Sequence, residues 1–167
     1  MPFMPLSVTF SVAPQLTAAD VAEAGRYGFR AIIDNRPDGE EPGQPTAAEM
    51  RALAASHGLG FAHVPTLGGA VSDEHVAQMA EALARLNGPV LAYCRTGTRA
   101  ATLWALTQSG SQTADALIAT AADAGYDLSP LRLRLNARRG GTSAAGAERA
   151  AIAGDDGAAR SIPNDAG

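Results

Sequence analysis

The sequence predicts an α/β fold in which a central, mostly parallel sheet of about four strands is flanked by helices. Short β-rich segments alternate with longer helical ones, which is the pattern that parallel sheets and their crossover helices produce. One segment, Gly88–Tyr93, is a continuous apolar run. Strands at the buried centre of a parallel sheet have this composition, so we expect this segment to lie inside the sheet.

The elements of the first half of the chain have recognisable starts and ends. Thr17 with Asp20 marks the start of a first helix, which Gly28 ends. Thr46 with Glu49 forms a capping box that starts a second helix. The predicted strands of the whole chain are Ser7–Val12, Phe29–Asp34, Leu59–Pro65 and Gly88–Tyr93.

The second half of the chain is mostly helical. Ser72 caps a helix whose apolar residues recur at helical spacing. Further helices are predicted at Arg99–Gln108 and Gln112–Gly125, and the Ser-Pro pair at 129–130 begins a last short one. Proline and glycine keep the segment 35–45 irregular, which makes it a loop after a strand.

Length and composition indicate one domain. A chain of 167 residues can bury one substantial core, and we assign residues 1–139 to this single folded domain. From residue 140 onward the chain is rich in glycine and alanine and has no aromatic residue. We expect residues 140–167 to form a disordered tail.

Charge and hydropathy exclude several classes of function. All 13 basic residues are arginines, and the chain has 17 acidic residues. It has no cluster of basic residues that could bind a nucleic-acid backbone. No segment reaches the length of a membrane span, and the first residues do not resemble a secretory signal. We therefore expect a cytoplasmic protein that binds neither nucleic acid nor membrane. The three histidines form no metal-ligand cluster, so no metal or cofactor is expected, and the oligomeric state stays open.

The loop that begins at Cys94, the only cysteine, is the main candidate for chemistry. It joins an apolar strand to a helix, so its backbone N–H groups and the helix N-terminus converge on one point. Gly97 lets the loop curl, and the Arg99 guanidinium can fold across its mouth to bind an oxyanion. A lone cysteine at a strand end is often an inert core residue. Here the glycine, the arginine and their context favour a thiolate nucleophile instead.

Three segments resemble a known family. These are SVAPQLTAADV, AIIDNRPDGEEPGQP and GPVLAYCRTGTRAATLWAL, and together they are similar to the beta-lactamase-hydrolase-like family, whose phosphatase-like domain has a tyrosine-phosphatase-like fold. The loop YCRTGTRA itself resembles those of the rhodanese sulfurtransferases and, more distantly, of the cysteine-dependent tyrosine phosphatases. The resemblance implies that Cys94 is the nucleophile and that Arg99 binds the anion. It also implies substrate-binding roles for the loop residues between them, Arg95, Thr96, Gly97 and Thr98.

The loop departs from the phosphatase pattern at three places. Phosphatases of this kind use C-x2-G-x2-R, whereas Cys94 to Arg99 is the shorter C-x2-G-x-R of single-domain rhodaneses. Tyr93 stands where phosphatases usually have histidine, and Ala100 stands where they have serine or threonine. These differences favour transfer of a single sulfur atom over turnover of a tetrahedral phosphate.

A phosphatase also needs a general acid for its leaving group, usually an aspartate. Asp34, Asp38 and Asp73 lie near the ends of predicted strands, and we choose Asp38 as the catalytic candidate. Asp73 is also explained as a first-turn helix residue, and Asp38 as a turn residue. Arg36 lies in the same loop as Asp38, where it can gather an anionic substrate or pair with Glu40 or Glu41.

Two further residues are predicted to be structural. Trp104, on the helix after the cysteine loop, is expected in the core, and His63 on its strand is expected to have a structural role. Arg95 should point out of the loop, where it meets either substrate or water.

These observations lead to one main hypothesis and two alternatives. The main hypothesis is a sulfurtransferase that moves a sulfane sulfur from a small anionic donor, through a Cys94 persulfide, to a thiol or cyanide-type acceptor. The first alternative is a phosphatase that hydrolyses a phosphorylated substrate through a Cys94 phosphocysteine. The second is a non-catalytic domain that binds an anion or a partner.

Overall fold

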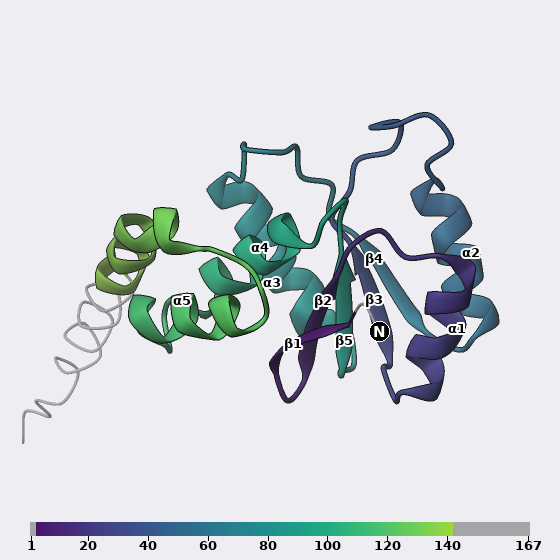
Figure 1. Cartoon of the computed structure of the whole chain (residues 1–167), viewed down its shortest axis with the longest axis horizontal. Coiled ribbons are helices and arrows are strands. Elements are labelled where there is room, and N and C mark those ends of the chain that lie inside the picture. The colour runs from purple at the N-terminus through teal and green to yellow at the C-terminus, as the bar shows by residue number, and fades with distance from the viewer. Residues whose placement is uncertain (1–2, 142–167) are drawn as a thin grey trace, which may run out of the picture.

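A five-stranded sheet forms the centre of the fold, which is known here from a computed structural model that describes residues 3–141 (Figure 1). The strand order is β1-β2-β5-β3-β4, and every neighbouring pair is parallel except β1 with β2. The strands are β1 (Met4–Ser7), β2 (Phe10–Ala13), β3 (Ala31–Asp34), β4 (Gly60–His63) and β5 (Val90–Tyr93). The predicted fold class is confirmed, and β5 is the central strand.

The sheet has one strand more than predicted, because the segment expected as a single first strand spans a hairpin. Residues 8 and 9 form its turn, and the Ser7 side-chain oxygen accepts a hydrogen bond from the backbone N–H of Thr9 at 3.2 Å. Val8 is 97% exposed at this turn, so its β-branched side chain misled the sequence prediction. The hairpin reverses the chain, and β1 therefore pairs antiparallel with β2.

The helices begin at the predicted caps. Thr17, Thr46 and Ser72 each accept a hydrogen bond from the third residue of their helix, whose own side chain bonds back to the cap backbone. The helices are α1 (Ala18–Arg26), α2 (Ala47–Ser56), α3 (Asp73–Arg85), α4 (Thr98–Gln108) and α5 (Ala114–Asp123). A 3-10 turn follows at Ser129–Leu131, and residues 132–141 are helical.

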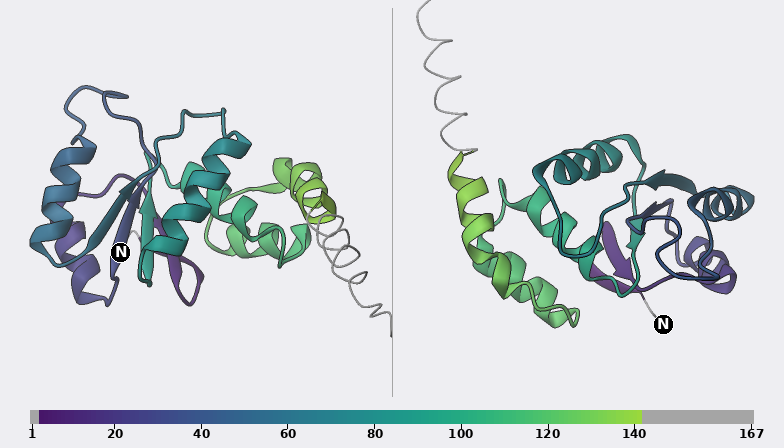
Figure 2. Two further views of the ribbon diagram at one scale, coloured as in Figure 1. Left: turned by 180° about the vertical axis from the view of Figure 1, so that it is seen from behind. Right: turned by 90° about the horizontal axis from the view of Figure 1, so that it is seen from above.

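Helices cover both faces of the sheet (Figure 2). Alternate residues of the central strands point to opposite faces. Ile32 and Leu91 pack in a core with residues of α1 and α2, whereas Ile33 and Ala92 pack in a second core with residues of α3 and α4. Beyond α4, α5 and the helical segment 132–141 extend the second side (Figure 1). The sheet is thus buried between two layers, as parallel sheets require.

Trp104 confirms its predicted place in the core. It is 3% exposed, and its ring stacks on Phe10 with centroids 6.1 Å apart. Among residues 3–141 no helix has the length and hydropathy needed to cross a membrane. We predicted disorder for residues 140–167. Residues 140 and 141 are helical instead, and the other residues of this range lie outside the described part of the chain.

Candidate active site

Cys94 directly follows the central strand β5 and begins a tight loop that ends where α4 starts. The backbone N–H of Gly97 donates to the Cys94 sulfur at an N–Sγ distance of 3.1 Å. Gly97 has a φ of 96°, a left-handed conformation that side chains disfavour, so the predicted need for glycine is explained. The sulfur therefore lies at the N-terminus of α4, where a negative charge is stabilised. Cys94 is fully buried in this state of the loop.

Arg99 is held across the loop by two partners. Its Nη1 donates to the backbone oxygen of Thr66 at 2.7 Å, and its Nη2 donates to Oε2 of Glu40 at 2.9 Å. Nη1 also lies 2.9 Å from Oε1 of Glu40, so the carboxylate forms a bidentate ion pair with the two terminal nitrogens of the guanidinium group. Partial burial alone would lower the pKa of Arg99, but its bonds to Glu40 and the nearby charge of the Cys94 sulfur raise it.

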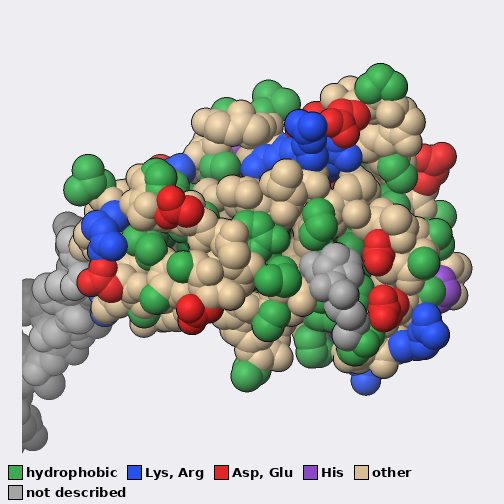
Figure 3. Space-filling model, viewed as in Figure 1, with side chains coloured by type: hydrophobic (Ala, Val, Ile, Leu, Met, Phe, Trp, Pro, Cys, Tyr) green, Lys and Arg blue, Asp and Glu red, His purple; other side chains and the backbone are tan. Residues whose placement is uncertain are grey.

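Arg36 connects this pair to a wider arginine–glutamate network, formed by Arg36, Arg95, Arg99, Glu40 and Glu41. Arg36 is buried, with 3% of its side chain exposed, and donates to Glu40 at 2.7 Å and to Glu41 at 2.6 Å. Glu41 in turn accepts from Arg95 at 2.9 Å. Figure 3 shows the basic side chains gathered beside acidic ones at the edge where the parallel strands end.

The network answers two questions that the sequence left open. Arg36 pairs with both glutamates, and its remaining Nη1 donates to Oε1 of Gln15 at 2.9 Å. Arg95 points outward, with 62% of its side chain exposed, while it pairs with Glu41. The loop 35–45 and the cysteine loop are thus joined by ion pairs. Three cations face two carboxylates, so these five side chains carry one net positive charge beside the Cys94 sulfur.

The three aspartates considered as general acids have other partners. The Asp38 side chain accepts a 2.7 Å hydrogen bond from the backbone N–H of Ala47, at the first turn of α2. Asp73, at the start of α3, pairs with Arg134 at 3.0 Å and Arg138 at 2.9 Å. The bond to Arg134 lowers the pKa of Asp73, which opposes a role as proton donor.

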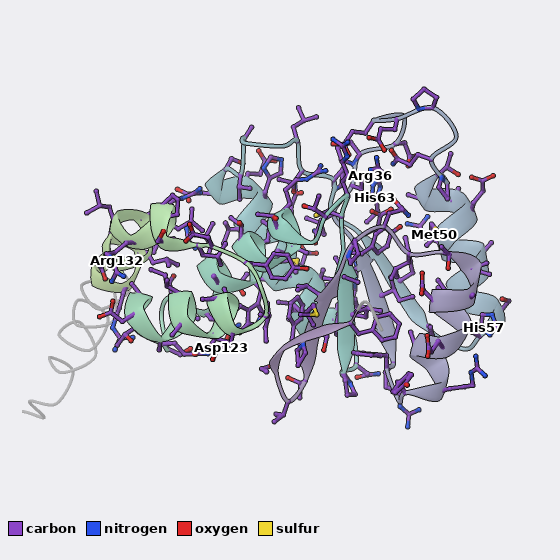
Figure 4. The ribbon with its side chains drawn as sticks, viewed as in Figure 1. Arg36, Met50, His57, His63, Asp123 and Arg132 are labelled. Atoms are coloured by element: carbon purple, nitrogen blue, oxygen red, sulfur yellow. The ribbon has the colours of Figure 1, made fainter. Side chains whose placement is uncertain are left out.

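Asp34, the last residue of β3, is buried, with 2% of its surface exposed. Burial raises its pKa, and its Oδ1 accepts from the backbone N–H of Arg36 at 2.8 Å. His63 lies beside it, with Nε2 3.0 Å from the backbone oxygen of Arg36, and Figure 4 shows Arg36 and His63 close together at the end of the sheet. His63 therefore supports the loop backbone, as a structural histidine would.

The other loop residues line the outside of the turn. Thr96 and Thr98 are exposed, and their hydroxyl oxygens lie 3.2 Å apart.

Tyr93 is buried, and burial raises its pKa far above the ordinary value, with the charge of Asp34 adding to this effect. Within residues 3–141 no group of three or more histidine, cysteine or acidic side chains could hold a metal ion.

Sequence reasoning missed three contributors to the site. Glu40 was considered only as a partner of Arg36, yet its carboxylate also holds Arg99. Thr66 supplies the backbone oxygen for the same arginine. Tyr126, whose hydroxyl donates to the backbone oxygen of Thr96 at 3.3 Å, comes from a segment 30 residues away. Nothing in the sequence around Tyr126 links it to the cysteine loop.

Fold and site together define a class, namely cysteine-loop domains of the tyrosine-phosphatase-like fold. The profile of one such family, described as "Beta-lactamase hydrolase-like protein, phosphatase-like domain", matches residues 3–111. The chain belongs to this family, as its sequence resemblance predicted.

Relatives from two bacterial genera are described as beta-lactamase hydrolase-like proteins. The beta-lactamase hydrolase-like protein of Agrobacterium fabrum is 36% identical over 96 residues, which cover 58% of this chain and 22% of that protein. The one from Xylella fastidiosa (strain Temecula1) is 32% identical over 130 residues, which cover 77% of this chain and 30% of that protein. The chain thus spans less than a third of these relatives.

Solved structures agree on the fold. A proposed phosphatase from Neisseria meningitidis is 35% identical with a TM-score of 0.75, over 83% of this chain and 99% of that one. A kinase-associated phosphatase whose catalytic cysteine is replaced by serine is 16% identical with a TM-score of 0.65, over 86% of this chain and 95% of that one. TpbA of P. aeruginosa, in complex with phosphotyrosine, is 20% identical with a TM-score of 0.56, over 80% and 90%. The last two show a common fold.

Proposed function

We propose that the chain is a sulfurtransferase in which Cys94 carries a sulfane sulfur from a small anionic donor to a thiol or cyanide-type acceptor. The observation that carries this proposal is the six-residue loop from Cys94 to Arg99, which directs the Gly97 N–H at the sulfur across 3.1 Å. This loop is one residue shorter than the phosphatase loop, and it suits one added sulfur atom better than a tetrahedral phosphate.

The contacts of Asp38 and Asp73 support sulfur over phosphate chemistry. Alkoxide and phenoxide leaving groups need a general acid, whereas sulfite and thiolates leave without one. The Asp38 carboxylate accepts from the first turn of α2, and that of Asp73 is paired with two arginines. Both carboxylates are thus engaged as acceptors by groups outside the cysteine loop.

The reaction proceeds in two balanced steps. With thiosulfate, the Cys94 thiolate attacks the sulfane sulfur, the S–S bond of thiosulfate breaks, and sulfite leaves with the bonding electron pair. The product is a Cys94 persulfide anion, whose terminal sulfur lies in the field of the α4 N-terminus and of Arg99. An acceptor such as cyanide then attacks that terminal sulfur, giving thiocyanate and restoring the Cys94 thiolate.

The second candidate is a phosphatase, and the comparisons favour it. The family is described by a phosphatase-like domain, and the structural neighbours are phosphatases by name. In this alternative the same thiolate attacks a phosphorylated substrate, Arg99 binds the phosphoryl oxygens, and Asp38 is the candidate acid. Because fold and function are not tightly linked, the neighbours leave the choice of transferred group to experiment.

Intact-protein mass spectrometry tests the proposal directly. After brief exposure to thiosulfate or glutathione persulfide, we expect the protein to gain the mass of one sulfur atom and to lose it on addition of cyanide or a thiol. Cys94→Ser should gain no mass, and since Cys94 is the only cysteine, any gain in the wild type is assigned to it.

Release of phosphate from an aryl phosphate is measured in parallel. Phosphate release that depends on Cys94, with no sulfur gain, would overturn the proposal in favour of the phosphatase. Inactivity in both assays would leave an anion- or partner-binding domain.

A further inference from the structure

Tyr126 lies outside the part of the chain that the family profile matches, yet it contacts the cysteine loop. Helix α5 ends at Asp123 with Ala124 as its C-cap, and the next residue, Gly125, has a φ of 94° that reverses the chain. The backbone N–H of Tyr126 then bonds to the oxygen of Ala121 at 2.8 Å, which fixes the direction of the return. Figure 1 shows this segment turning back alongside α4, the helix that follows the loop.

The Tyr126 side chain lies against the outer edge of the loop. Its hydroxyl donates to the Thr96 backbone oxygen at 3.3 Å. A Cβ atom placed on Gly97 would lie 2.2 Å from that hydroxyl and 2.8 Å from the ring carbon that bears it. Gly97 is also the residue whose N–H points at the Cys94 sulfur. Tyr126 is therefore packed against the backbone that holds the nucleophile.

The electrostatic environment of Tyr126 agrees with this position. Burial raises its pKa, and the nearby charge of the Cys94 sulfur raises it further, so the hydroxyl stays protonated and remains a donor. Arg99, which also lies near the Cys94 sulfur, is fixed by Glu40 and Thr66. Tyr126 and Arg99 thus both lie beside the cysteine loop, and Cys94 has no exposed surface.

We propose that Tyr126 is a positioning and specificity-determining residue, which fixes the Thr96–Gly97 edge of the loop and limits the size of the molecule that reaches Cys94. The substrate class that fits is a small donor, such as an inorganic thiosulfonate or a low-molecular-weight persulfide, rather than a bulky one. This inference rests on the proposed role of Cys94 as nucleophile, and it holds whichever group is transferred.

Alkylation of the single cysteine tests the inference without any enzyme assay. The full chain and its variants are treated with iodoacetamide, which is small, and with N-phenylmaleimide, which is bulky, and the two rates are compared. In Tyr126→Ala we expect the ratio of the bulky to the small rate to rise at least about tenfold. In Tyr126→Phe, where the ring stays and one neutral hydrogen bond is lost, the ratio should rise by about two- to fivefold. Tyr27→Ala, a matched change at an exposed tyrosine, should leave the ratio unchanged.

The ratio separates size selection from general loosening of the fold. Loosening would accelerate both reagents by the same factor, and an unchanged ratio in both Tyr126→Ala and Tyr126→Phe would overturn the proposal. If Tyr126→Ala fails to fold, a Tyr126→Phe ratio equal to that of the wild type overturns it as well. Because the readout is alkylation, a changed ratio supports the role of Tyr126 even if the persulfide experiment fails.

Discussion

Asp38→Asn separates the two chemistries, and the structure fixes what the substitution does to the fold. Asp38 accepts a 2.7 Å hydrogen bond from the N–H of Ala47 at the first turn of α2. Asparagine keeps an oxygen acceptor at this place and loses the negative charge that the helix N-terminus favours. For an exposed side chain that charge contributes about 0.3–1 kcal/mol. A loss of about 0.5 kcal/mol corresponds to a fall in Tm of roughly 2 °C for a domain of this size.

The effect on turnover differs between the two mechanisms by orders of magnitude. Sulfur transfer needs no proton donor, so thiocyanate formation from thiosulfate and cyanide should change less than about twofold, whereas loss of a general acid costs about 10²–10⁴-fold. Both activities and the Tm are measured on the same preparation, with Asp38→Ala as a second variant that also removes the acceptor. A hundredfold loss of thiocyanate formation in Asp38→Asn, with Tm nearly unchanged, would refute the reasoning.

Three further predictions concern the loop and its arginine. The bond to Arg99 holds the pKa of Glu40 below its usual value of 4.5, so its stabilising effect is present above pH 4.5 and is lost as the pH falls through the lower pKa of the folded state. Glu40→Gln should therefore be less stable than the wild type by about 1 kcal/mol at pH 7, with the gap closing in urea titrations at pH 3. Gly97→Ala should cost about 1–3 kcal/mol from its left-handed backbone alone, and Tyr126→Ala should recover part of the total loss in the double variant, as thermal melting will show. Arg99→Lys keeps the positive charge but loses the planar guanidinium group that pairs with the Glu40 carboxylate. We therefore expect kcat/KM to fall by about tenfold or more in steady-state kinetics. Full activity would contradict the anion-binding role assigned to Arg99.

Local sequence signals predicted the positions of the capped helices and of the central strand well. The capping residues Thr17, Thr46 and Ser72 start helices where they were expected to, because a side-chain oxygen that bonds its own helix acts within a few residues. The apolar run at Gly88–Tyr93 marked the central strand, since burial on both faces leaves no place for polar residues. The nucleophile candidate and its arginine followed from the same short stretch.

Contacts between distant segments were harder to predict. Glu40 and Arg99 are 59 residues apart, and Tyr126 and Thr96 are 30 apart, so no local pattern records either contact. The N-terminal hairpin was predicted as a single strand for a different reason. Its turn at residues 8 and 9 has no glycine, asparagine or proline, and is closed by serine and threonine hydroxyl groups instead.

The burial of Cys94 at the end of the central strand also makes the thiol a reporter on the whole domain. Strand β5 is paired on both sides, so its backbone is expected to open only when the sheet itself comes apart. A reagent too large to pass the side chains around the loop can then react only with molecules that have opened globally. Its labelling rate in the wild type would measure the population of those molecules, and thus the stability of the fold, from one natural cysteine and without denaturant.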